Sequence, residues 1–227
     1  MSFVVIEGLD GSGKSTQIKL LRNYLEEKQI PYKYLHFPRT GSPVYGELVA
    51  RFLRGELGKI NEVNPYLVAL IYAGDRNDAK GMIKKWLSEG YFVLVDRFVI
   101  SNIAFQCAKL ERKKDQDTLK KWIMDLEYSY NKLPVPDINL FLDVPFHFTR
   151  TQLSGERRGE DREYLEGASD IHEENLEFQV KVRNVYLSMQ GDEGFKILQC
   201  FDDDGNILPP EKIFTKIKKS LFENEIA

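Results

Sequence analysis

The chain has 227 residues, of which 42% are hydrophobic and 12% aromatic, so it is long enough to bury a sizeable core. Its formal net charge of -3 argues against a protein whose main ligand is a nucleic acid backbone, because such domains carry a basic excess. Two distant cysteines, Cys107 and Cys200, support neither a disulfide framework nor a zinc site, and no apolar run approaches a membrane span, so we expect a soluble, cytoplasmic protein.

A short apolar run, Phe3 to Ile6, predicts a first strand, and a phosphate-binding motif follows it. Residues 8–15, GLDGSGKS, fit the pattern GxxxxGK[ST] without a gap. The glycines let backbone N–H groups surround a polyphosphate, Lys14 reaches its terminal oxygens, and the Ser15 hydroxyl can ligate Mg²⁺. Apolar residues at helical spacing from Thr16 to Lys28 place this loop at a helix N-terminus, which favours anions.

Four further apolar runs predict strands, and stretches with helical periodicity separate them. We expect strands at 32–37, 92–95, 138–142 and 195–198, and further helices at 45–53, 65–88, 119–131, 171–189 and 211–222. This alternation predicts an α/β fold, with a five-stranded parallel sheet flanked by helices on both faces. We find no internal repeat or linker, so residues 1–227 are expected to form a single domain.

Polar residues follow the predicted strands, at residues 38–40, at Asp96-Arg97 and at Asp143. In open α/β sheets the ligand lies beyond the carboxyl ends of the strands, so these residues are candidates for a site. The polar segment 149–166 carries four arginines and two glycines. It is either a solvated surface loop or a mobile lid that closes on a transferring phosphate, and the phosphate loop in the same sheet favours the lid.

A phosphate loop is common to GTPases, transport ATPases and small-molecule kinases, so other motifs must distinguish these classes. A GTPase needs an NKxD motif, and residues 131–134, NKLP, lack the aspartate. A transport ATPase needs a strand that ends in Asp-Glu, whereas this chain has Asp96-Arg97. Asp96 can hold Mg²⁺ or orient an attacking oxygen, while the Arg97 guanidinium can bind a second anionic group; a plain Asp–Arg surface pair is the alternative.

The run from Leu94 to Gln106 closely resembles the thymidylate kinase signature, in which Asp-Arg-aromatic precedes a serine and then Ala-aromatic-Gln. The other matching segments follow the same order: the phosphate loop, residues 37–40, residues 70–76, Pro136-Asp137 and the arginine-rich segment. The resemblance covers residues 1 to about 190 and implies the P-loop NTPase fold with a lid. Gly11 and Ser12 stand where some family members have an arginine, which resembles the bacterial type with lid arginines.

The resemblance implies an acceptor site for dTMP. It places Asp10 at the sugar 3′-hydroxyl, Arg39 and Arg97 at the 5′-phosphate, Tyr72 against the thymine ring and Phe105 beneath the sugar. The complete implied set is Asp10, Arg39, Tyr72, Arg76, Arg97, Ser101, Phe105 and Gln106. Two departures from the family pattern, at residues 39–42 and 107–109, loosen the expectation of base selectivity.

The resemblance also implies the donor site and the catalytic groups. The ATP-binding set is Gly8, Asp10, Gly11, Ser12, Gly13, Lys14, Ser15, Thr16 and Arg150, of which Arg150 packs on the adenine. The catalytic set is Lys14, Asp96, Arg97, Arg157, Arg158 and Arg162. Ser15 and Asp96 are the expected Mg²⁺ ligands.

The function that these residues predict is transfer of the γ-phosphoryl group of ATP·Mg²⁺ to dTMP, which yields dTDP for dTTP synthesis, without a covalent enzyme intermediate. One alternative is another nucleoside monophosphate or deoxynucleoside kinase of the same fold. A more distant alternative is a nucleotide-dependent switch or ATPase without an acceptor. The resemblance also implies a homodimer.

Overall fold

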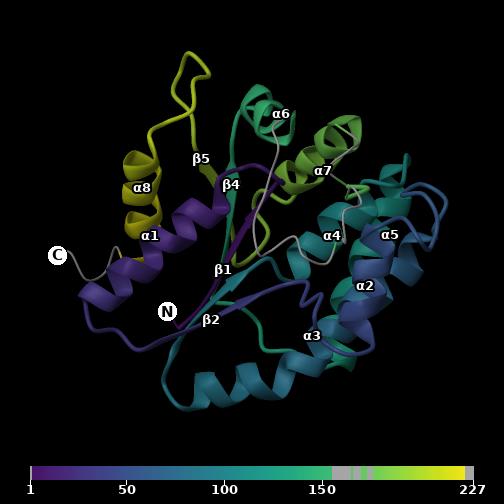
Figure 1. The fold of residues 1–227 in the computed structure, drawn as a ribbon, viewed down its shortest axis with the longest axis horizontal. Coiled ribbons are helices and arrows are strands. Elements are labelled where there is room, and N and C mark those ends of the chain that lie inside the picture. The colour runs from purple at the N-terminus through teal and green to yellow at the C-terminus, as the bar shows by residue number, and fades with distance from the viewer. Residues whose placement is uncertain (1, 155–164, 166–169, 173–175, 223–227) are drawn as a thin grey trace.

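Five apolar segments lie side by side in one parallel sheet, in the order β2-β3-β1-β4-β5 (Figure 1). The computed structural model describes residues 2–154, 165, 170–172 and 176–222. The strands are β1 (Phe3–Gly8), β2 (Tyr32–His36), β3 (Phe92–Asp96), β4 (Ile138–Asp143) and β5 (Phe195–Gln199). All five predicted strands are confirmed, and so is their parallel arrangement.

Helices cover both faces of the sheet (Figure 1). They are α1 (Lys14–Glu27), α2 (Tyr45–Leu53), α3 (Pro65–Ser88), α4 (Val99–Cys107), α5 (Lys113–Met124), the π-helix η1 (Asp125–Tyr130), α6 (Phe146–Ser154), α7 (Leu176–Ser188) and α8 (Pro210–Phe222). Alternate residues of β1 face opposite sides: Val4 and Ile6 pack with α1 and α8, whereas Phe3 and Val5 pack with α3, α4, α5 and α7. The predicted two-sided α/β fold is therefore confirmed.

Some helices have the bounds predicted from the sequence, and others differ from them. Helices α2 and α3 have the predicted bounds. The helix predicted at 119–131 begins earlier, at Lys113, and continues as η1. For the helix predicted at 171–189, the structure describes α7 over Leu176–Ser188, and Ile171 and His172 lie in a turn. Helix α4 was not predicted, because all nine of its residues are buried and such a helix has no polar face to reveal its period.

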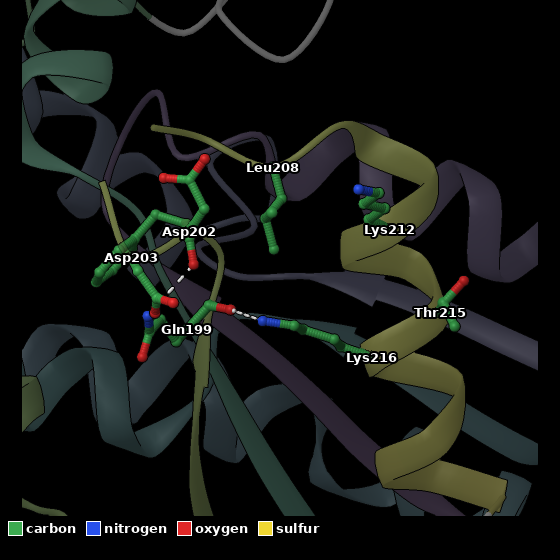
Figure 2. A pocket seen from close by; sticks show the side chains of 8 residues that line it. Gln199, Asp202, Asp203, Leu208, Lys212, Thr215 and Lys216 are labelled. Atoms are coloured by element: carbon green, nitrogen blue, oxygen red, sulfur yellow. Dashed lines mark hydrogen bonds between the residues drawn. The ribbon is translucent and has the colours of Figure 1, made fainter. Parts of the chain in front are cut away.

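An open hollow of about 520 Å³ lies between the end of β5, the loop after it and α8 (Figure 2). Its lining residues are Gln199, Phe201, Asp202, Asp203, Leu208, Lys212, Thr215 and Lys216. None of them belongs to the predicted site, which is built at the ends of the more central strands. In the part of the chain that is described, no helix is both long and apolar enough for a membrane crossing.

Leu21 on α1 is fully buried against the sheet, so Leu21→Ala should lower the free energy of unfolding by about 2–5 kcal/mol through lost burial and a residual cavity. The matched control is Lys19→Ala on the exposed side of the same helix, expected to change it by at most about 0.5 kcal/mol. Urea denaturation measures both. Equal effects of the two substitutions would contradict the assignment of this face of α1 to the core.

Candidate active site

The phosphate loop joins β1 to α1 and has the backbone conformation that its glycines allow. Gly11 and Gly13 have φ of 73° and 81°, in the left-handed region that side-chain-bearing residues rarely adopt. Gly13 is the N-cap of α1 and provides no side-chain cap, so the positive end of the helix faces the loop. The Nζ of Lys14 donates to the carbonyl oxygens of Gly8 and Leu9 at 3.4 and 3.2 Å. The loop thus presents backbone N–H groups and an ammonium to an anion.

Lys14 and Asp96 occupy neighbouring buried positions at this edge of the sheet. Burial, with the Arg97 guanidinium nearby, lowers the pKa of Lys14 to about 8. Burial alone would raise the pKa of Asp96, but a hydrogen bond from His36 and the charge of Lys14 hold it below its ordinary value. The His36 Nδ1 lies 3.3 Å from the Asp96 Oδ2. Asp96 therefore stays ionised.

Asp96 fits the predicted role of a Mg²⁺ ligand. Its Oδ1 is buried and has no hydrogen-bond partner among the described residues, which is the state of a carboxylate oxygen that a cation would satisfy. Ser15, the other expected ligand, is exposed at the start of α1. A Mg²⁺ ion needs only one or two such protein groups, because it keeps several waters and binds substrate phosphates.

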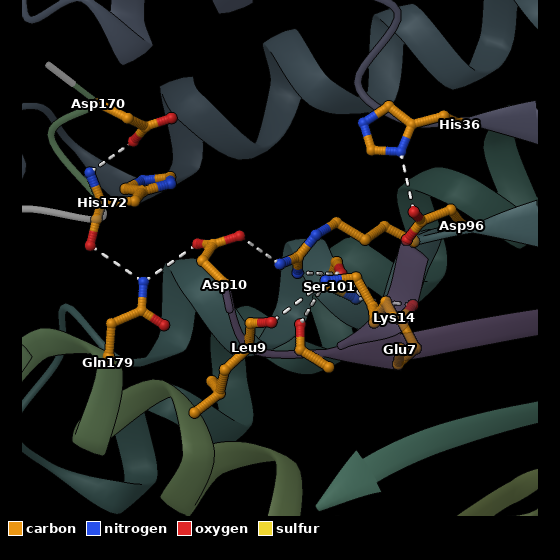
Figure 3. Close-up of polar contacts among 12 residues, drawn as sticks. Glu7, Leu9, Asp10, Lys14, His36, Asp96, Ser101, Asp170, His172 and Gln179 are labelled. Atoms are coloured by element: carbon orange, nitrogen blue, oxygen red, sulfur yellow. Dashed lines mark hydrogen bonds and ion pairs between the residues drawn. The ribbon is translucent and has the colours of Figure 1, made fainter. Parts of the chain in front are cut away.

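An ion pair joins the phosphate loop to the end of β3. The Asp10 Oδ1 accepts from the Arg97 Nη2 at 2.7 Å, and the Asp10 Oδ2 accepts from the Gln179 Nε2 at 3.1 Å. Figure 3 shows the Gln179 amide between Asp10 and the backbone carbonyl of His172. Burial would raise the pKa of Asp10, but Arg97 and Lys14 hold it well below its usual range. Residues from the loop, β3 and α7 thus meet at one carboxylate.

Arg97 also contacts two other predicted acceptor residues. Its Nη1 donates to the Ser101 Oγ at 3.2 Å, and its guanidinium carbon lies 5.1 Å from the centre of the Phe105 ring. Ser101 and Phe105 lie on successive turns of α4, which begins two residues after Arg97. The structure therefore brings together four of the residues predicted from the sequence: Asp10, Arg97, Ser101 and Phe105.

Arg39 lies in the loop after β2 and is held by Asp75 of α3. The Asp75 carboxylate accepts from the Arg39 backbone N–H at 2.8 Å and from its Nε at 2.9 Å, and the Asp75 carbonyl accepts from its Nη2 at 2.8 Å. The Asp75 side chain is 1% exposed, whereas that of Arg39 is 22% exposed. Asp75 fixes the direction of the guanidinium and leaves part of it open to solvent.

Tyr72 and Arg76 are four residues apart on α3 and so share one side of that helix. The Arg76 side chain is 2% exposed, and its Nε and Nη2 both donate to the Glu127 Oε1, the former at 2.9 Å. Tyr72 packs against a cluster of buried side chains from α2 and α3 that includes Phe52 and Val68. Gln106 is buried on α4, and within the described ranges no hydrogen bond joins it to the Asp10–Arg97 group. Arg76 is thus buried and paired with Glu127.

Comparison with known proteins identifies the family. The family model described as thymidylate kinase matches residues 6–202. The chain belongs to the thymidylate kinase family. It is 33% identical to the thymidylate kinase of Carboxydothermus hydrogenoformans over 218 residues, which cover 95% of this chain and 94% of that protein. It is also 32% identical over 202 residues to a probable thymidylate kinase of Pyrobaculum aerophilum, with 88% of each chain covered.

A solved structure gives the same result for the fold. The thymidylate kinase of Candida albicans superposes with a TM-score of 0.69 at 22% identity, over 98% of this chain and 91% of that one. The resemblance drawn from the signature at residues 94–106 is therefore confirmed as family membership, and the P-loop NTPase fold is confirmed with it.

The expected lid is only partly within the described residues. Residues 149–154 are helical in α6, and Arg150 is exposed on that helix. Three predicted catalytic arginines, Arg157, Arg158 and Arg162, lie outside the described residues. Their roles stay predictions.

Four polar side chains that hold the site were not identified from the sequence: Glu7, Asp75, Glu127 and Gln179. Glu7 offered a weak signal, because it is an acid directly after the apolar run of β1, and Asp75 lies within a segment that matches the family. Glu127 and Gln179 offered none, because they lie 51 and 169 residues away from their partners Arg76 and Asp10.

Gly46 on α2 allows the close approach of the loop that carries Arg39. A Cβ at Gly46 would lie 2.1 Å from the Arg39 carbonyl oxygen, a backbone atom. Gly46→Ala should therefore lower the free energy of unfolding by about 1–3 kcal/mol and shift Arg39 away from Asp75. The control is Gly41→Ala in the same loop, where a Cβ meets no atom within 4 Å. Denaturation curves and a crystal structure of each variant test this; an undisturbed Arg39–Asp75 pair in Gly46→Ala would refute it.

Lys109, which follows α4, should make the stability of the fold depend on pH. Its Nζ lies 4.7 Å from the centre of the Phe52 ring, and burial lowers its pKa from 10.5 to about 7. Between pH 7 and pH 10.5 the lysine is protonated in the unfolded chain and neutral in the folded chain. Below pH 7 it is charged in both states, so the full cost of burying the charge lowers the free energy of unfolding, and this cost becomes smaller as the pH rises. Lys109→Met should stabilise the protein more at pH 6 than at pH 10, as measured by denaturation at both. The exposed control Lys84→Met should show no such difference, and an equal gain at both pH values would contradict the assignment.

Proposed function

We propose that the protein is a thymidylate kinase that transfers the γ-phosphoryl group of ATP to dTMP and releases dTDP and ADP. The observation that carries this proposal is the contact between the phosphate loop and the signature of the family. Asp10, inside the loop, pairs with Arg97, which in turn contacts Ser101 and Phe105. A donor site and the residues expected to hold the acceptor therefore share one charged group.

The proposed role of Arg97 is to hold the acceptor phosphate. A guanidinium has five N–H donors; among the described residues Asp10 and Ser101 each accept from one, which leaves three for a phosphate. Arg39, fixed by Asp75, is proposed to meet the same phosphate from the loop after β2. Alignment of the acceptor oxygen with the γ-phosphate, rather than a covalent intermediate, then supplies the catalysis.

Lys14 is proposed to contact the terminal phosphates of ATP from within the loop, and Ser15 and Asp96 are proposed to hold Mg²⁺. A Mg²⁺ ion held there would supply positive charge against the charge that develops on the phosphates during transfer. The orphaned Asp96 Oδ1 supports this assignment. Burial keeps Lys14 and Asp96 in surroundings of low dielectric, where their charges act strongly on a phosphoryl group.

The lid arginines are proposed to provide the remaining positive charge. Arg97 and Arg39 already face the carboxylates of Asp10 and Asp75, so neither is a fully uncompensated cation. We propose that Arg157, Arg158 and Arg162 act on the transferring phosphate and that Arg150 packs on the adenine. The whole chain is proposed to act as one kinase domain, because its five strands share one sheet. A homodimer stays a prediction.

Steady-state rates with ATP and a panel of acceptors test the function directly. We expect turnover of dTMP to exceed that of dUMP, dCMP, dGMP, AMP and thymidine, since a buried polar edge left unpaired by the wrong base costs about 1–3 kcal/mol. A higher kcat/KM for another acceptor would identify a related kinase instead. ATP hydrolysis that dTMP does not affect would favour the switch or ATPase. Lys14→Ala should abolish turnover, and near-normal kcat in that variant would rule out the proposed role of the loop.

A further inference from the structure

Glu7 is a fully buried carboxylate near the carboxyl end of β1, and it has no part in the proposed transfer of phosphate. It lies on a strand whose other buried side chains are apolar. A buried carboxylate is expensive to desolvate, so its partners must account for its presence. Those partners belong to α4 and α7, the two helices that contribute Ser101 and Gln179 to the site.

One oxygen of Glu7 caps helix α4. Phe98, the N-cap residue, provides no side-chain cap, and the Glu7 Oε1 accepts from the backbone N–H of Phe98 at 2.9 Å and from that of Ser101 at 3.3 Å. A carboxylate from β1 thus does what an N-cap side chain normally does, and its charge is favourable at the positive end of the helix. Phe98 directly follows Arg97, so this cap also fixes the backbone next to that arginine.

The other oxygen of Glu7 holds two hydroxyl groups. The Oε2 accepts from the Ser101 Oγ and from the Tyr186 Oη, the latter at 2.9 Å, and the two hydroxyl oxygens lie 2.9 Å apart. Burial, with the Glu7 charge, raises the pKa of Tyr186, so its phenol stays protonated and can donate. The Tyr186 ring is stacked on Phe141 at 4.2 Å between ring centres. Since Ser101 gives its proton to Glu7, its lone pairs face the Arg97 Nη1 at 3.2 Å.

Arg97 is held by both of these arrangements. Its φ is 63°, a left-handed conformation that costs energy for a residue with a Cβ and persists only where the surroundings enforce it. The Glu7 Oε1 fixes the backbone on one side of Arg97, and the Glu7 Oε2 orients the hydroxyl that receives its side chain.

We propose that Glu7 is a positioning residue for phosphoryl transfer, which acts through Phe98 and Ser101 to aim the Arg97 guanidinium at the acceptor phosphate. The inference rests on the proposed kinase function. It goes beyond that function in assigning the aim of Arg97 to a residue that contacts neither substrate.

Glu7→Gln separates positioning from folding. The amide oxygen can keep both backbone N–H bonds of α4, while the amide nitrogen reverses the hydrogen bonds to the two hydroxyls and removes the charge beside Arg97. We expect kcat/KM for dTMP to fall at least about tenfold, while KM for ATP changes less than about twofold. The matched control is Asp137→Asn, which alters a carboxylate that accepts from Ser2 and Phe3 at the opposite end of β1. This control should change only stability.

A double-mutant cycle with Arg97→Lys tests whether Glu7 acts through Arg97. If it does, Glu7→Gln should cost less than about threefold in kcat/KM for dTMP once Arg97 is lysine, because the orientation it provides is already lost. An undiminished loss in that background would overturn the proposal. Equal effects of Glu7→Gln and Asp137→Asn on kcat/KM would overturn it too.

Tyr186→Phe provides the same test if Glu7→Gln does not fold, because it removes one hydroxyl and keeps the stacked ring. It should lower kcat/KM for dTMP about threefold or more and leave KM for ATP unchanged; a loss shared equally by both substrates would refute the proposal. Wild-type rates distinguish a failure of the kinase function from a failure of the role proposed for Glu7. Absence of dTMP turnover in the wild type would overturn the kinase function and the inference together, whereas turnover that is insensitive to these variants would overturn the inference alone.

Discussion

The ion pair between Asp10 and Arg97 is the interaction on which the site depends. Asp10 belongs to the phosphate loop after β1, and Arg97 follows β3, the neighbouring strand in the sheet. Parallel pairing places the ends of these strands at one edge, and the ion pair then fixes the loop relative to the start of α4. Ser101 and Gln179, which come from α4 and α7, each bond directly to one of these two residues.

The same pattern of paired charges recurs around the site. Arg39 pairs with Asp75, Arg76 with Glu127, and Arg183 of α7 with Asp143 at the end of β4, the last with two hydrogen bonds of 2.7 and 2.9 Å. Each ion pair links two different parts of the fold. It also holds the arginine's guanidinium group in a fixed direction. Such pre-organisation lowers the cost of ordering these side chains when an anionic substrate binds. Removing one charged side chain of a pair would leave the charge of its partner without compensation.

Sequence reasoning succeeded where the signal was local. The phosphate loop, the five strands and the signature at residues 94–106 are each contained within a short run, and the periods of α2 and α3 identify them to the residue. It failed for α4, whose uniform burial hides its period, and for the partners of the arginines, which only tertiary folding brings close. Residues 8–15 predict that a phosphate binds, but no spacing rule connects Glu7 with Tyr186, 179 residues later.

The burial of α4 on every side has a dynamic consequence. Its backbone lies between α3, α5 and α7, and its N-terminal N–H groups are bonded to a carboxylate in the centre of the sheet. A helix enclosed in this way opens only when most of the fold opens, so its amide hydrogens belong to the slowest-exchanging class of the protein. The wall of the site that carries Ser101 and Phe105 is therefore a fixed reference surface.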